Sequence, residues 1–236
     1  MDFGFTTAAY VVAAVLFILS LGGLSGQESA KRAVWYGIVG MALAVFATLI
    51  GPGSGLWILS IILIAGGGVI GYLLASRVEM TQMPELVAGM HALVGLAAVF
   101  VGYNAELVMN TVGALQSAGD EAGLAALKGF ASTVAHKTQA EINILKIEVF
   151  LGVFIGAVTF TGSVIAYGKL AGKVTSAAQK LPGGHMLNAG AAILSLILLV
   201  IYMSTGGGWT LLVMSLLAFF IGYHLIMGIG GADMPV

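Results

Sequence analysis

The sequence predicts an all-α integral membrane protein, a polytopic bundle of about seven transmembrane helices. Of its 236 residues, 59% are hydrophobic and 8% are charged, and the mean hydropathy is +1.06. Soluble globular proteins carry about 25% charged residues. Apolar runs of about 20 residues, enough to cross roughly 30 Å of hydrocarbon, recur along the chain. The composition therefore fits a lipid bilayer.

The predicted spans follow from these apolar runs, taken in order. They cover 5–24, 34–51, 55–75, 85–109, 144–168, 187–203 and 209–228. The start of the chain lacks the basic region of a cleaved signal peptide, so the first run is expected to remain as a span. Tight turns are expected at 51–54 and 204–209. The polar stretch 110–143 is expected to be an external loop, either mobile or containing a short amphipathic surface helix.

The distribution of basic residues predicts the orientation in the membrane, because cytoplasmic loops hold the excess of lysine and arginine. The first, third and fifth loops contain Lys31, Arg32, Arg77, Lys169, Lys173 and Lys180, whereas the others contain only Lys128 and Lys137. We therefore expect an external N-terminus and a cytoplasmic C-terminus. The chain reads as cut short at Val236, where another apolar stretch begins.

Several functions are excluded by composition. A formal net charge of −1 without a basic run does not fit nucleic-acid binding. The absence of cysteine excludes disulfides, thiolate metal sites and thiol catalysis. We find no paired histidines that indicate a metal site and no nucleophile–base arrangement.

Glycine makes up 35 of the 236 residues, and much of it lies within spans. The pairs Gly67/Gly71 and Gly152/Gly156 have helical spacing and are expected to form packing seams, because small residues let membrane helices approach closely. The glycine runs 66–68 and 206–208 lack the strand and the Lys-Ser/Thr sequence of a phosphate loop. We expect these runs to be structural.

His91 is the only acidic or basic side chain between Leu86 and Ala105. An ionisable group at bilayer depth costs free energy and is a functional candidate by default. It shares a face of small residues with Ala88, Gly95, Ala98 and Gly102. This face is expected to border a hydrated gap, with His91 about 10 Å inside the cytoplasmic end. The alternative is a neutral histidine hydrogen-bonded within the bundle.

The outer half of the membrane offers further polar groups on the fourth and fifth spans. Asn104 and Glu106 lie on the fourth span, and Glu148 lies near the start of the fifth, close to Lys146. Thr159 and Ser163 share a small face of the fifth span with Gly152 and Gly156. The predicted proton path contains His91, Asn104, Glu148, Thr159 and Ser163. Alternatively, Glu106 and Glu148 extend to the membrane surface.

The remaining ionisable residues are assigned by position. Glu85 follows Pro84 in the first turn of the fourth span, where an acidic side chain suits the helix dipole. His224 is expected at the membrane interface, and His136 and His185 in loops. Asp233 lies in the Gly-rich segment after the last span, on the inferred cytoplasmic side, where glycine permits close approach of another domain.

Several strings of the sequence recur in one known family. They are 78–86 (VEMTQMPEL), 91–98 (HALVGLAA), 148–163 (EVFLGVFIGAVTFTGS), 230–235 (GGADMP) and the opening Ala8-Ala9-Tyr10 run. Together they resemble the membrane part of the beta subunit of proton-translocating NAD(P) transhydrogenase, over nearly the whole chain.

The resemblance implies an enzyme that transfers hydride from NADH to NADP while a proton crosses the membrane inward. It places His91 in the proton path, and Asp233, with Glu85, where the membrane domain couples to the NADP(H)-binding domain. NAD(H) and NADP(H) are then bound by other domains, and this fragment alone is not expected to transfer hydride. The implied partners are the alpha subunit, the subunit's own C-terminal NADP(H)-binding domain, a second alpha–beta unit and membrane lipid. The implied location is the bacterial cytoplasmic membrane.

The sequence departs from the family pattern in two ways. The family's further spans and soluble NADP(H) domain are absent from residues 1–236, and the 110–143 loop looks longer than in some relatives. Two other interpretations stay open at this point. One is a stand-alone proton or cation transporter subunit, and the other is a structural assembly subunit, in which His91 would be dispensable.

Overall fold

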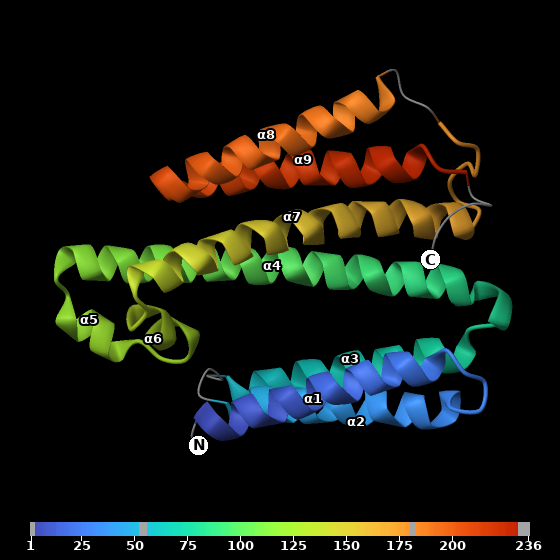
Figure 1. Cartoon of the computed structure of the whole chain (residues 1–236), viewed down its shortest axis with the longest axis horizontal. Coiled ribbons are helices and arrows are strands. Elements are labelled where there is room, and N and C mark those ends of the chain that lie inside the picture. The colour runs from blue at the N-terminus through green and yellow to red at the C-terminus, as the bar shows by residue number, and fades with distance from the viewer. Residues whose placement is uncertain (1–2, 52–55, 180–182, 231–236) are drawn as a thin grey trace. The chain divides into compact units, whose positions relative to one another are not determined.

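The computed structural model describes residues 3–51, 56–179 and 183–230. Every regular element in these ranges is helical, and seven helices are long and apolar enough to cross a membrane, which confirms the predicted helix bundle. These helices are α1 (Phe3–Leu24), α2 (Ala30–Ile50), α3 (Trp57–Arg77), α4 (Met83–Ala118), α7 (Gln139–Leu170), α8 (Gly184–Thr205) and α9 (Gly208–Met227) (Figure 1). The chain divides into two compact units, residues 1–72 with 121–135 and residues 73–120 with 136–236.

In the first unit, α1 and α2 form an antiparallel hairpin with a seam of small residues (Figure 1). Ala33, Gly40 and Ala47 recur every seven residues on α2 and are all buried. A Cβ added to Gly40 would lie 3.2 Å from the Leu16 Cβ, so the helices are in close contact there. The Ser20 hydroxyl donates to the Ala33 carbonyl at 2.7 Å and fixes the register of the pair.

Helix α3 is apolar around its whole circumference and has no buried residue. The prediction that Gly67 and Gly71 form a packing seam is wrong within their unit, because no atom lies within 4 Å of a Cβ added to either glycine. Close glycine spacing permits a helix contact but does not supply a partner. A helix that is hydrophobic on all sides is typical of a membrane span.

In the second unit, α4 and α7 run antiparallel and make the most extensive helix contact (Figure 1). Gly95 and Gly156 lie at its centre. A Cβ added to Gly95 would lie 2.7 Å from the Gly156 carbonyl oxygen, and one added to Gly156 would lie 2.7 Å from the Gly95 carbonyl oxygen. The predicted close approach of these two glycine faces is confirmed. Gly152 is different, because a Cβ there would meet no atom within 4 Å.

Helices α8 and α9 form a second antiparallel hairpin, and α9 packs along α7. The Thr161 hydroxyl of α7 donates to the Phe219 carbonyl of α9 at 2.9 Å, next to Gly222. Since α4, α7, α8 and α9 alternate in direction, the α8–α9 turn lies at the same end of this unit as the C-terminus of α4 (Figure 1).

The helices that flank the 110–143 stretch are longer than predicted. α4 continues to Ala118, where Gly119 ends it in the left-handed region with φ 65°. α7 begins at Gln139, because Thr138 and Glu141 form a reciprocal N-terminal cap. Along the sequence, α4 and α7 are separated by two short helices, α5 (Glu121–Ala126) and α6 (Phe130–Ala135). The 36 residues of α4 correspond to about 54 Å, well beyond the hydrocarbon thickness.

Replacing Gly156 with leucine should destabilise the α4–α7 contact strongly, because the side chain has to enter space occupied by the Gly95 backbone. Overpacking costs about 1–3 kcal/mol in ordinary cores, and the cost is greatest where backbone cannot move. Gly152→Leu, one turn away on the same helix, is the matched control. Thermal denaturation of the full-length subunit in detergent should show a lower midpoint for Gly156→Leu and a near-normal one for Gly152→Leu. Equal midpoints would contradict the glycine seam.

Candidate proton path

His91 lies in the third turn of α4, and its side chain is exposed in the isolated chain. Its Nδ1 is 2.9 Å from the Val87 carbonyl oxygen. Because a carbonyl oxygen only accepts hydrogen bonds, Nδ1 carries the hydrogen and donates it to Val87. In the neutral ring this leaves Nε2 as the nitrogen with a lone pair. The imidazole is therefore fixed in one tautomer, with Nε2 available to take up a proton.

The α4–α7 contact has two edges, and the hydrogen bonds identify one of them. On α4, the Tyr103 hydroxyl is 2.9 Å from the Ser215 hydroxyl of α9, and Glu106 is hydrogen-bonded to Tyr202 of α8. We call this side, which faces α8 and α9, the covered edge. The opposite side of the contact is the open edge.

His91, Glu148, Thr159 and Ser163 belong to the open edge. Successive residues are about 100° apart around a helix. His91 therefore lies about 40° around α4 from Gly95, and Tyr103 lies on the other side of Gly95. On α7, angles are measured around the helix from Gly156. Ser163 lies at about 20°, Thr159 at about 60° and Glu148 at about 80°, all toward the same edge of the contact as His91. The exposure of His91 and Glu148 agrees with this placement.

The antiparallel register sets the levels of these residues along the membrane. Gly95 lies against Gly156 and Phe160, and Ala88 clusters with Ala166. This register places His91 level with Ser163, and Thr159 about one turn further toward the outer end. The structure thus brings the predicted histidine and the two hydroxyls to one edge, although no hydrogen bond links them within the described residues.

The other predicted site residues are placed differently. Asn104 is nine residues from Gly95, about 180° around α4, and its exposed side chain points away from α7. It does not share an edge with His91. Glu85 is half-buried in the first turn of α4, behind Pro84, as expected. Asp233 lies outside the described residues, so its role stays a prediction.

Glu106 is the buried carboxyl group of the covered edge, with 4% of its surface exposed. It accepts a hydrogen bond from the Tyr202 hydroxyl and another from the Asn110 side chain at 3.1 Å. Of the two possibilities left open by the sequence, extension to the membrane surface is therefore wrong for Glu106. Tyr202 was not among the candidates, because nothing in the sequence pairs position 106 with a position 96 residues away.

His224, which was expected at the membrane interface, lies in the last turn of α9 and is buried between α8 and α9. Its Nδ1 is 2.8 Å from the Asn188 side-chain oxygen, and its ring stacks on Phe220 at 5.6 Å. The amide partner on the neighbouring helix makes this burial possible. A pocket of about 440 Å³ adjoins the pair and is also lined by Gln179 and His185.

Lys169 is another buried group that hydropathy did not identify. Its ammonium donates to the carbonyl oxygens of Ile226 at 2.9 Å and Ile229 at 2.7 Å, at the C-terminus of α9. Lysine side chains stabilise helix C-termini in this way, because the last carbonyls lack partners in the helix. Lys169 was predicted to lie in a loop, but it lies in the last turn of α7.

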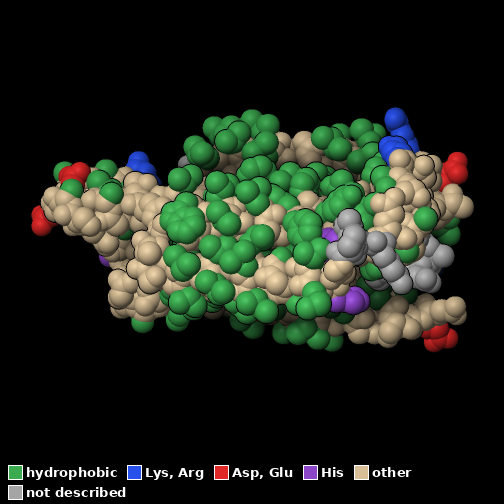
Figure 2. Space-filling view, turned by 90° about the horizontal axis from the view of Figure 1, so that it is seen from above, with side chains coloured by type: hydrophobic (Ala, Val, Ile, Leu, Met, Phe, Trp, Pro, Cys, Tyr) green, Lys and Arg blue, Asp and Glu red, His purple; other side chains and the backbone are tan. Residues whose placement is uncertain are grey.

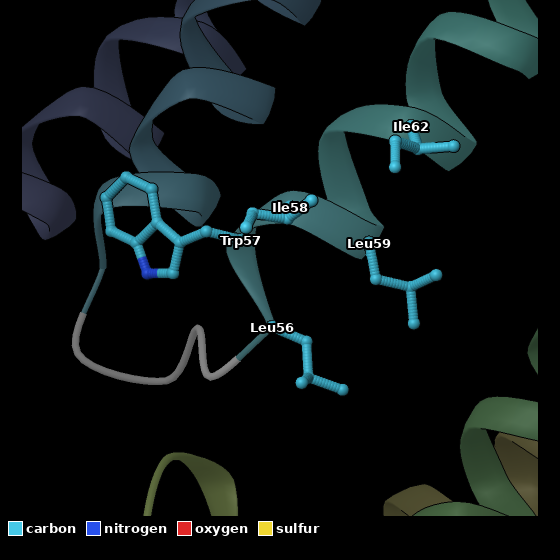
Figure 3. A pocket seen from close by; sticks show the side chains of 5 residues that line it. All are labelled: Leu56, Trp57, Ile58, Leu59 and Ile62. Carbon is cyan, nitrogen blue, oxygen red and sulfur yellow. The ribbon is translucent and has the colours of Figure 1, made fainter.

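Apolar side chains dominate the rest of the surface. They cover the middle of the face seen in Figure 2, and the acidic and basic side chains visible there lie toward helix ends. A hollow at the start of α3 is lined by Leu56, Trp57, Ile58, Leu59 and Ile62 (Figure 3). This lining offers no ionisable group and no candidate for proton transfer.

The observations define a polytopic membrane protein with ionisable side chains inside its helix bundle. The profile of the NAD(P) transhydrogenase beta subunit family matches residues 6–236. Two relatives from Rhodospirillum rubrum, both named NAD(P) transhydrogenase subunit beta, are 41% identical to the chain over 236 residues, which is 100% of this chain and 46% of each relative. The chain belongs to the NAD(P) transhydrogenase beta subunit family. It spans about half the length of the curated relatives it matches.

Replacing Lys169 with methionine should destabilise the α7–α9 pair, because the carbonyls at the end of α9 lose their charged donor. Hydrogen bonds to charged groups contribute about 1.5–3 kcal/mol. Lys173→Met, at an exposed position just beyond the helix, is the control. The thermal midpoint of the full-length subunit in detergent should fall for Lys169→Met only. An unchanged midpoint would mean that water replaces the ammonium at no cost.

Proposed function

We propose that this chain is the proton-translocating membrane part of an NAD(P) transhydrogenase, in which inward proton movement drives hydride transfer from NADH to NADP. Family membership and the seven apolar helices support this proposal. The observation that carries it is His91, an imidazole inside a span with Nδ1 fixed and Nε2 available. No observation on the described residues favours a stand-alone transporter or an assembly subunit over this function.

The open edge supplies the chemistry of the proposed path. The His91 imidazole accepts a proton at Nε2 and releases it from the same atom. The hydroxyls of Thr159 and Ser163 both donate and accept hydrogen bonds, and they orient water beside the imidazole. Glu148 lies further out on this edge. Each charge moved across 100 mV carries about 2.3 kcal/mol, which is the free energy available for coupling.

The nucleotides of the reaction do not fit the glycine-rich segments of this chain. A dinucleotide site needs a glycine turn between a strand and a helix, where backbone N–H groups meet the phosphates. Gly66, Gly67 and Gly68 lie inside α3, and Gly206 and Gly207 form the turn between α8 and α9. We therefore assign NAD(H) and NADP(H) to other domains, and we expect residues 1–236 alone to lack hydride transfer.

Coupling to those domains is assigned to the cytoplasmic end of the membrane part. Asp233 and Glu85 are the proposed coupling residues. The proposed partners are the alpha subunit, the C-terminal NADP(H)-binding domain of the same subunit and a second alpha–beta unit, all in the bacterial cytoplasmic membrane. Asn104 stays in the proposal as an outer polar group, but its direction on α4 separates it from the His91 edge.

The proposed orientation places the N-terminus outside and the C-terminus inside, since most lysines and arginines fall in the first, third and fifth loops. Residues 1–236 contain no cysteine, so a single cysteine introduced among them reports the position of its own loop. Ala118→Cys should react with an impermeant maleimide added outside intact cells, whereas Lys173→Cys should react only after the membrane is opened. Reaction of both from one side would overturn this orientation.

Replacing His91 with alanine in the complete enzyme should reduce proton pumping on the order of 100-fold, the contribution typical of a positioned acid–base group. NAD(H) binding should be unchanged, because the NAD(H) site is assigned to another domain of the complex. The measurement is proton uptake per hydride transferred, followed with a pH-sensitive dye in sealed vesicles. His185→Ala, an exposed histidine at the start of α8, is the control. Normal pumping in His91→Ala would reduce His91 to a packing residue.

A further inference from the structure

Glu106 is buried among apolar helices, where a carboxyl group costs free energy, but both of its oxygens have hydrogen-bond partners. It lies inside an apolar helix, and only 4% of its surface is exposed. Oε1 accepts from the Asn110 amide at 3.1 Å, and Oε2 accepts from the Tyr202 hydroxyl. Tyr202 has no exposed surface and packs against the Phe150 ring at 5.7 Å between ring centres. The carboxyl group is thus held in a defined position between α4 and α8.

Glu106 lies near the α8–α9 turn, at the proposed outer end of the bundle. Tyr202 is three residues, about 4.5 Å of helix rise, from the end of α8. A Cβ added to Gly208, at the start of α9, would lie 3.9 Å from Oε1 of Glu106. The carboxyl therefore lies close to the glycines of the α8–α9 turn.

The ionisable groups around Glu106 come from three of the four helices. α4 contributes Tyr103, one turn deeper, and α8 contributes Tyr202. α7 contributes Lys146, whose ammonium would lie 3.5 Å from a Cβ added to Gly206 in the turn. α9 contributes the neutral Thr210 at this level. Glu148 lies on the open edge, away from the cluster.

A mere structural tie between α4 and α8 needs only a neutral amide, whereas an ionised carboxyl at membrane depth carries a large desolvation cost. The Tyr202 partner suits both protonation states. A tyrosine hydroxyl donates to the carboxylate, and after rotation it accepts from the protonated acid. Tyr103 and Ser215 form the next hydroxyl pair inward along the covered edge. Tyr202 can therefore form a hydrogen bond with Glu106 in both protonation states of the carboxyl group.

We propose that Glu106 is a proton-exchanging residue at the outer entrance of the membrane part, on the covered edge of the α4–α7 contact. The Glu106 carboxylate takes a proton from external water beneath the α8–α9 turn and becomes a neutral carboxylic acid. It then releases the same proton inward and returns to the carboxylate. This assignment rests on the proposed proton-translocating function, and it adds a carboxyl group on the covered edge to the path.

The test uses the complete enzyme in sealed vesicles and compares wild type, Glu106→Gln and the control Glu121→Gln, whose side chain is exposed outside the spans. Infrared difference spectra should contain the carbonyl band of a protonated carboxylic acid that titrates with external pH, and Glu106→Gln should remove it. Proton-linked hydride transfer should fall on the order of 100-fold in Glu106→Gln, as for loss of an acid–base group. Glu121→Gln should match wild type in both measurements.

Two further variants separate the possible failures. In His91→Ala the Glu106 band should persist, so loss of pumping there tests the proposed function and not this inference. If Glu106→Gln fails to assemble, Tyr202→Phe should displace the pH midpoint of the same band, because one hydrogen-bond partner of the carboxyl is lost. Three results would overturn the proposal and make Glu106 a structural tie. They are an infrared band that is unchanged by Glu106→Gln, proton transport in Glu106→Gln within about twofold of wild type, and a pH midpoint of the band that is insensitive to Tyr202→Phe.

Discussion

The backbone contact between α4 and α7 is the constraint on which the second unit depends. Gly95 and Gly156 allow each helix to reach the backbone of the other, so the register of the pair is fixed at that point. Without a hydrophobic force between helices in lipid, such close packing is a main source of association. Once the register is fixed, each polar residue beside the contact is assigned to one of its edges. His91 falls on the open edge and Glu106 on the covered edge.

Hydrogen bonding then decides which polar groups the bundle can contain. A polar group taken into an apolar environment without a partner costs several kcal/mol. Within the described ranges, no buried side-chain nitrogen or oxygen lacks a partner. Glu106 finds Tyr202, His224 finds Asn188, and Lys169 finds the carbonyls that end α9. Each pair connects two helices, so the ionisable residues also hold the bundle together.

Hydropathy was enough to predict the seven spans, because bilayer thickness imposes a length that apolar runs display directly. The glycine faces at Gly95 and Gly156 were also predictable, since their spacing reports one side of a helix. Partners were not predictable. The pairing of Glu106 with Tyr202 joins helices that are distant in sequence. Gly67 has the same spacing pattern as Gly156, but within its unit no atom lies within 4 Å of a Cβ added to it.

The ends of α4 and α7 were also not predictable from hydropathy. The stretch after residue 109 is polar, and polarity suggested a loop, whereas helix propensity and the Gly119 and Thr138 caps extend α4 and α7 beyond the apolar core. Hydropathy measures the solvent that a segment prefers, and it does not measure whether the segment stays helical. Lys169 was misplaced for the same reason. Its charge marked it as a loop residue, although its long side chain lets it remain in the helix.

The fixed tautomer of His91 limits how any proton traffic through this residue is timed. With Nδ1 held by the Val87 carbonyl, arrival and departure of a proton share a single atom, Nε2. A ring open at both nitrogens would pass protons straight through and dissipate the gradient. A ring with one open nitrogen has to face its source and its destination in turn. In the proposed path, loading and unloading of His91 would then be separate events.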